Sequence, residues 1–145
     1  MIILFIRMVV IQSESPIKIF KMGREFLGHI LYPVHAFLID DILIDSGSKS
    51  ARRKIMKIWK KYNINHVINT HWHEDHIGNN RSLQKEKNVE IYASEKDAPK
   101  ILNPKQQKYW LYEKIMWGIP EESTVKVVSD KLLFKNYAFT LIPTP

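Results

Sequence analysis

The chain is organised around residues 70–79, T-H-W-H-E-D-H-I-G-N, which follow directly on a predicted strand that ends at Asn69. This segment gathers three histidines and a carboxylate: His71, His73, Asp75 and His76. If the strand continues into the loop, His71 and His73 leave the same face of the chain, because alternate residues of a strand share a face. They can therefore bind one metal ion together. Asp75 and His76 come from a different backbone direction and suit a second, adjacent ion.

The types of residue in this segment fit a metal site. Neutral imidazole is a good ligand for zinc, and a carboxylate favours a harder or more hydrated position. The chain has no cysteine, so a thiolate site is excluded. The alternative is a set of structural histidines beside a solvated Glu-Asp pair, but three clustered histidines behind a strand seldom have that role. The helical zinc motif H-E-x-x-H needs histidines four apart, whereas His73 and His76 are three apart.

The sequence H-x-H-x-D-H at residues 71–76 resembles the signature of the metallo-β-lactamase superfamily of metal-dependent hydrolases. The resemblance implies a dinuclear centre, usually of zinc and sometimes of iron or manganese, bound by His71, His73, Asp75 and His76. It also gives Asp75 a catalytic role in orienting a metal-bound hydroxide. That hydroxide would attack an ester, thioester, lactam or phosphoester bond in a small-molecule substrate.

A second element, Asp45-Ser46-Gly47, stands at the end of a predicted strand. It matches the D-x-G element that the same superfamily carries before its metal motif, where the aspartate supports the metal loop from behind. A carboxylate at a strand end can accept hydrogen bonds from the loop and fix histidine tautomers. The alternative is an Asx-turn or a helix cap. We favour the supporting role for Asp45.

The resemblance implies an α/β fold, an αββα sandwich of two similar halves, of which this chain supplies about the first half as one mixed sheet with flanking helices. Local patterns agree with a hairpin that turns at Asp40-Asp41 and with a right-handed strand, helix, strand unit. The predicted strands are 17–20, 34–39, 42–44, 66–69, 89–93, 125–128 and 137–142, and residues 22–28 are predicted as a turn or loop. The predicted helices run from Ser48 or Ser50 to Tyr62, from 80 to 87 and from 95 to 102.

The later metal ligands of the superfamily have no counterpart in this sequence, which ends I-P-T-P at residues 142–145. A catalytic zinc takes three protein ligands plus water. Four ligands shared by two ions leave each site short, so we expect an isolated chain to be inactive or impaired. The sheet face meant for a second sheet would be bare and apolar, which favours a homodimer or a separately encoded C-terminal half. The alternative is a non-catalytic, degenerate or split fragment that acts as an interaction module.

Length and composition favour one domain over residues 1–145, since 145 residues with 45% hydrophobic content can form one core. Residues 1–11 are apolar apart from Arg7. They are too few to span a bilayer, so no membrane segment is expected. We favour an extra buried strand within residues 1–15, with an over-extended start or a weak targeting segment as alternatives. The absence of cysteine is compatible with a cytoplasmic location.

A net charge of +7 favours anionic partners. The helix after Ser50 carries a basic face: Arg52, Arg53, Lys54, Lys57, Lys60 and Lys61. No aromatic residue interleaves on that face, so a solvated surface is favoured over a nucleic-acid site. Nucleic-acid binding, including the nuclease branch of the superfamily, stays an alternative.

Two further groups of candidate site residues are the histidines outside the motif and an aromatic segment. The histidines outside the motif, His29, His35 and His66, are expected to be structural. The aromatic segment 109–117 is apolar almost all round and must be covered. It can form a lid or substrate wall, a dimer contact or plain packing, and we favour packing.

Overall fold

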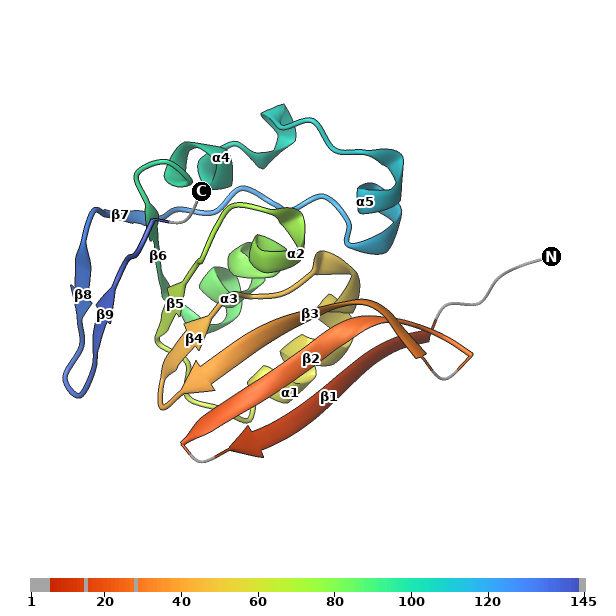
Figure 1. Ribbon diagram of the computed structural model, residues 1–145, viewed down its shortest axis with the longest axis horizontal. Coiled ribbons are helices and arrows are strands. Elements are labelled where there is room, and N and C mark those ends of the chain that lie inside the picture. The colour runs from red at the N-terminus through yellow and green to blue at the C-terminus, as the bar shows by residue number, and fades with distance from the viewer. Residues whose placement is uncertain (1–5, 15, 28, 144–145) are drawn as a thin grey trace.

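The protein is built on one mixed sheet, seen in a computed structural model that describes residues 6–14, 16–27 and 29–143 (Figure 1). Seven strands follow one another in chain order from edge to edge. The antiparallel strands are β1 (Ile6–Glu14), β2 (Ile17–Phe26), β3 (His29–Ile39) and β4 (Ile42–Ile44). The parallel strands that continue from β4 are β5 (His66–Ile68), β6 (Glu90–Ser94) and β7 (Lys126–Val128).

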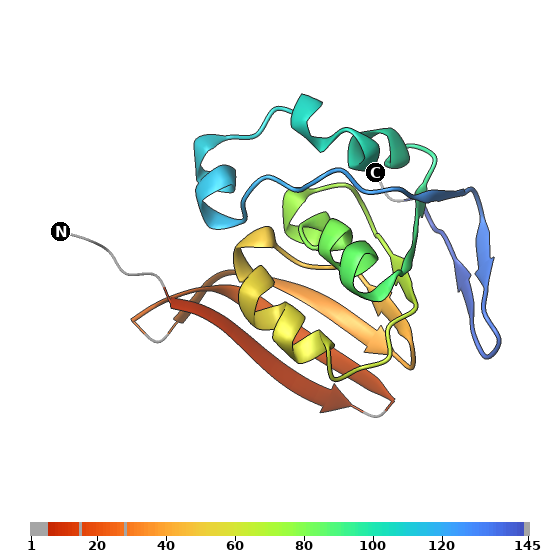
Figure 2. The same cartoon turned by 180° about the vertical axis from the view of Figure 1, so that it is seen from behind.

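The two longer helices cover one face of this sheet (Figure 2). The longer ones are α1 (Arg52–Trp59) between β4 and β5, and α3 (Asn80–Lys87) between β5 and β6. The shorter ones are α2 (Glu74–Ile77), α4 (Ala98–Leu102) and α5 (Leu111–Met116), with single turns at Lys49–Ala51 and Pro104–Gln106. No helix within the described ranges has the length and apolar character needed to cross a membrane.

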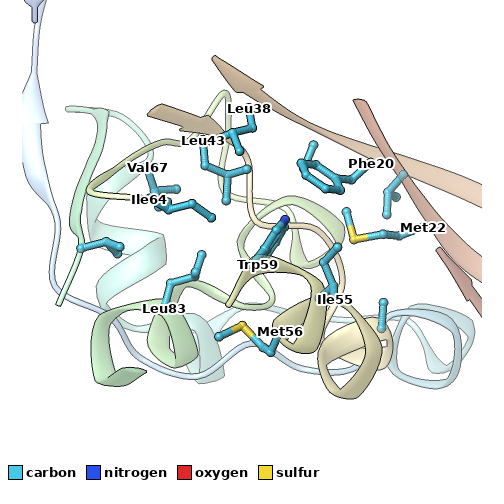
Figure 3. Packing of buried hydrophobic residues seen from close by; sticks show 14 of the residues in the cluster. Phe20, Met22, Leu38, Leu43, Ile55, Met56, Trp59, Ile64, Val67 and Leu83 are labelled. Carbon is cyan, nitrogen blue, oxygen red and sulfur yellow. The ribbon is translucent and has the colours of Figure 1, made fainter. Parts of the chain in front are cut away.

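The main core lies between the sheet and helices α1 and α3. Trp59 is fully buried, and its ring meets Phe20 of β2 edge to face with the ring centroids 6.0 Å apart. Figure 3 shows Trp59, Ile55 and Leu83 reaching from the helices toward the strands. The prediction that α1 buries one apolar stripe against the sheet is thus confirmed.

A hairpin covers part of the opposite face. Strands β8 (Lys131–Leu133) and β9 (Ala138–Thr140) form a separate two-stranded sheet. The hairpin packs its apolar residues against Ile42, Ile68 and Val128 of the main sheet. The expectation of a bare face is therefore wrong over β4 to β7. The expected exposure of this face is found over β3, where Phe37 is 36% exposed.

Several predicted boundaries are wrong. Residues 22–26 belong to β2, because the antiparallel ladder with β3 continues through a register shift between Met22 and Arg24. Helix α1 ends at Trp59 rather than Tyr62. Helix α4 begins at Ala98, since residues 95–97 form a turn in which the Asp97 amide donates to Ser94 Oγ. Strand β8 has no counterpart among the predicted elements.

The fold class is confirmed: one mixed sheet with flanking helices. The hairpin turn at Asp40 and Asp41, helix α3 and the β4, α1, β5 crossover lie where the sequence places them. The predicted N-terminal strand exists as β1, and residues 1–5 lie outside the described part of the chain.

Candidate metal centre

The predicted metal loop lies at the carboxyl ends of two neighbouring parallel strands. Ile44 of β4 pairs with Ile68 of β5, so Asp45 and the segment that follows Ile68 leave the sheet side by side. The Asp45 amide donates to the Ile68 carbonyl at 2.9 Å. Loops at the carboxyl ends of parallel strands are the usual place for ligand sites in such sheets. The topology therefore brings together two motifs that are 25 residues apart.

The structure gathers the predicted ligands. The ring centroids of His71 and His73 are 4.7 Å apart, and those of His71 and His76 are 4.0 Å apart. Asp75 Oδ2 lies 3.5 Å from His76 Nε2. As the side chains stand, no three His, Cys, Asp or Glu side chains of the described residues are arranged to hold one ion. The four side chains are thus neighbours, although they do not form a finished coordination shell.

Asp45 lies behind the loop and binds it at three points. Its Oδ1 accepts a hydrogen bond from the Thr70 amide at 2.9 Å, and its Oδ2 accepts one from Thr70 Oγ1 at 2.7 Å. The same Oδ2 lies 2.7 Å from His76 Nδ1. The side chain is buried. A carboxylate in this position fixes the ring orientation of His76 and leaves Nε2 on the side of Asp75.

Gly47 of the same D-x-G element adopts a φ of 65°, which glycine tolerates and most residues avoid. A Cβ atom at this position would collide with the side chain of Met22. The backbone conformation therefore accounts for glycine at the third position of the element.

Sequence reasoning missed a buried polar network that holds the far end of the loop. Ser46 Oγ donates to the His76 carbonyl at 3.1 Å, and the Asn79 side chain donates to the carbonyls of Ser46 at 2.6 Å and Ser48 at 2.9 Å. Asn80 donates to Asn69 Oδ1 at 2.8 Å, which joins α3 to the end of β5. The signal available in the sequence was the run of small polar residues after Asp45 and the Asn-Asn pair after Gly78.

The surroundings of His71 and His76 shift the pKa values of the two imidazoles in opposite directions. Burial, followed by the nearby His76 and His73, lowers the pKa of His71. Burial also acts to lower the pKa of His76, but the hydrogen bond and charge of Asp45, with the charges of Asp75 and Glu74, outweigh it and raise that pKa. Burial raises the pKa of Glu74, the buried residue between His73 and Asp75.

The chemistry of these donors fits a borderline divalent ion. The lowered pKa of His71 favours its neutral form, and neutral imidazole is the form that binds metal. With His73, His76 and the Asp75 carboxylate, the loop offers nitrogen and oxygen donors of the kind that zinc accepts. The residues that would hold metal are thus His71, His73, Asp75 and His76.

Only part of the aromatic segment near the loop packs as expected. Trp117 packs against the main core, whereas plain packing is the wrong expectation for the exposed part of the segment. Helix α5 has no buried residue, and Trp110 and Leu111 are 73% and 72% exposed. Tyr32 of β3 lies beside this segment, with its ring centroid 6.1 Å from that of Trp117. A lid, a substrate wall or a contact surface is left among the predicted roles.

The histidines outside the motif lie apart from the loop. His66 packs against Phe134 on the hairpin side of the sheet, with ring centroids 4.7 Å apart. His35 stacks with Phe37, and His29 is exposed at the start of β3. One member of the predicted basic face is misplaced: Arg52 is half-buried and donates to Glu121, whereas Arg53, Lys54 and Lys57 are exposed.

Solved structures share this fold. A metallo-beta-lactamase from Pontibacter korlensis is 19% identical with a TM-score of 0.64, over 90% of this chain and 58% of that one. The FEZ-1 metallo-beta-lactamase of Legionella gormanii is 19% identical with a TM-score of 0.61, over 84% and 48%. The subclass B3 metallo-beta-lactamase BJP-1 of Bradyrhizobium japonicum is 18% identical with a TM-score of 0.57, over 91% and 47%. The chain thus spans about half the length of the structures it matches.

The family comparison covers most of the chain. No curated protein matches this sequence. The model of the metallo-beta-lactamase superfamily matches residues 30–145, a range that includes the D-x-G element, the metal loop and the exposed aromatic segment. The chain belongs to the metallo-beta-lactamase superfamily.

Proposed function

We propose that this chain carries the metal-binding half of a metal-dependent hydrolase. The observation that supports this most is the gathering of His73 and His76 about His71, with ring centroids 4.7 and 4.0 Å from that of His71, beside Asp75 and in front of Asp45. Bound divalent ions would polarise a carbonyl or phosphoryl oxygen and lower the pKa of a water molecule. Substrates of this kind are esters, thioesters, lactams and phosphoesters.

The residues of the chain would divide the work. His71, His73 and His76 present imidazole nitrogens to the metal. Asp75 would bind metal and also accept a hydrogen bond from the attacking water, which aims that water at the substrate. Asp45 keeps the His76 ring in place through Nδ1. The four donors fall short of the three protein ligands that each of two catalytic zinc ions takes. The chain alone would therefore bind metal but hydrolyse poorly.

A zinc binding and turnover experiment tests this function. Zinc bound per chain is measured by equilibrium dialysis for the wild type, for His71→Ala and for the matched control His35→Ala, which lies outside the loop. A panel of ester, thioester, lactam and phosphodiester substrates is then assayed with and without a chelator. We expect zinc binding that His71→Ala lowers at least tenfold and His35→Ala leaves unchanged. Equal binding by all three proteins would contradict the proposal.

A second function, as an interaction module that does no chemistry, is favoured by one observation. Trp110 and the helix α5 that follows it expose four large apolar side chains, and clustered exposed apolar residues commonly mark contact surfaces. These residues are Trp110, Leu111, Tyr112 and Ile115. This function predicts that the chain retains its fold and associates with a partner after His71→Ala. It also predicts that zinc binds no more tightly to the wild type than to that variant.

A further inference from the structure

Arg52 connects three segments at the edge of the metal loop. It is the first residue of α1, and its guanidinium donates from Nη1 to Glu121 Oε1 at 2.7 Å and from Nη2 to the Gly78 carbonyl at 3.1 Å. The side chain is 27% exposed. The guanidinium thus joins the start of α1 to Gly78, which caps the end of α2, and to Glu121, which follows α5 in the chain. A planar guanidinium suits this role because its donors point in fixed directions.

The acceptor, Gly78, stands directly behind the helical turn that carries Asp75 and His76. This residue is packed closely against the chain after β4. A Cβ atom here would collide with the backbone nitrogen of Lys49 and the carbonyl oxygen of Gly47. Carbonyls at a helix end lack helical partners, and a basic side chain can satisfy them. Gly78 thus has little room to move, because backbone atoms surround it. The hydrogen bond from Arg52 to its carbonyl adds a further contact that fixes this residue.

Glu121 holds the guanidinium in this orientation. Lys49 Nζ lies 3.2 Å from the same Oε1 atom, so two cations share one carboxylate oxygen. The hydrogen bond from Arg52, with the contact of Lys49, lowers the pKa of Glu121 to about 2. The carboxylate is thus ionised at neutral pH. Charge-assisted hydrogen bonds of this kind are short and directional.

We propose that Arg52, oriented by Glu121, is a positioning residue that sets the place of the turn carrying Asp75 and His76 through the carbonyl of Gly78. Its loss should weaken zinc binding and loosen this turn while the rest of the fold keeps its stability. The zinc part of the inference rests on the proposed function, whereas the loosening of the turn does not.

The test compares Arg52→Met with Arg53→Met, its exposed neighbour on the same helix. Hydrogen exchange is followed at the amides of Ile77, which donates to the His73 carbonyl, and Asn79, which donates to Ser46 Oγ. Zinc affinity is measured by competition with a chromophoric chelator. We expect Arg52→Met to speed exchange at these two amides but not in β5 and β6, and to weaken zinc binding roughly tenfold. Arg53→Met should change neither quantity.

Two variants sharpen the result. Arg52→Lys keeps the charge but cannot donate to both acceptors in a fixed fork, so it should restore only part of the protection. Glu121→Gln keeps an acceptor and should loosen the turn less than Arg52→Met. Unchanged exchange at Ile77 and Asn79, or exchange that rises evenly over the whole molecule, would overturn the inference. Absence of zinc binding by the wild type would contradict the proposed function, while the exchange pattern would still decide the role of Arg52.

Discussion

At the scale of the residue, Asp45 joins the end of β4 to the metal loop. It accepts hydrogen bonds from the Thr70 amide and Thr70 Oγ1 and contacts His76 Nδ1, all within 2.9 Å. We predict that Asp45→Asn lowers the free energy of unfolding by about 2 kcal/mol, since an amide cannot accept from all three groups and buried donors lose their partner. Urea unfolding measures this. The exposed control Asp130→Asn should change it by less than about 0.5 kcal/mol.

The pH dependence of the metal-free protein tests the two histidine shifts. The raised pKa of His76 stabilises the fold fully below about pH 6.5, and this contribution is lost as the pH rises through the pKa of the folded state. The lowered pKa of His71 acts in the opposite sense, costing stability as the pH falls below about 6.5. An NMR titration of the imidazole rings should show His71 losing its proton at lower pH than His76. The reverse order would contradict this account of the loop.

At the scale of the element, sequence patterns predict the parts that rest on local periodicity or on a motif. Helix α3 and the turn at Asp40 and Asp41 lie as predicted because polar helix formers and acidic turn residues specify them locally. The two motifs of the site are visible in the sequence for the same reason. Strand β8 and residues 22–26 of β2 could not be predicted from the sequence. They are strands because they pair with β9 and β3, and local sequence patterns do not show such pairing.

The hairpin of β8 and β9 offers a matched pair for testing the second apolar layer. Leu132 is 9% exposed and packs toward the main sheet, whereas its neighbour Leu133 is 76% exposed. We predict that Leu132→Ala lowers the free energy of unfolding by about 2 kcal/mol. Leu133→Ala should change it by less than about 0.5 kcal/mol. Equal effects in thermal unfolding would show that the hairpin does not pack on the sheet as described.

The exposed aromatic segment belongs to the same scale. Its sequence predicts only that so apolar a stretch must be covered. In the described part of the chain Trp117 packs against the core, but Trp110, Leu111 and Tyr112 stay exposed. The periodicity of apolar residues cannot distinguish a helix that packs within its own chain from one whose apolar residues are left to contact a ligand or partner. The exposure of Tyr112 and Trp110 is therefore visible only in the structure.

At the scale of the whole molecule, one sheet with its helices forms a well-packed core and also brings together the residues of the proposed metal site. The core is complete on the helix side, where Trp59 is fully buried, and the opposite face is covered over β4 to β7 by the hairpin. The chain spans about half the length of the structures it matches. The proposed division is that this half folds and binds metal, while hydrolysis needs further ligands.

The most direct test of the central claim is a zinc titration of the metal-free chain, followed through the imidazole nitrogen signals of its six histidines. We predict that the signals of His71, His73 and His76 shift together as zinc is added. The signals of His29, His35 and His66 should not move and serve as internal controls. Zinc-dependent shifts confined to those three control residues, or no shift at any histidine, would contradict the assignment of residues 71–76 as a metal site.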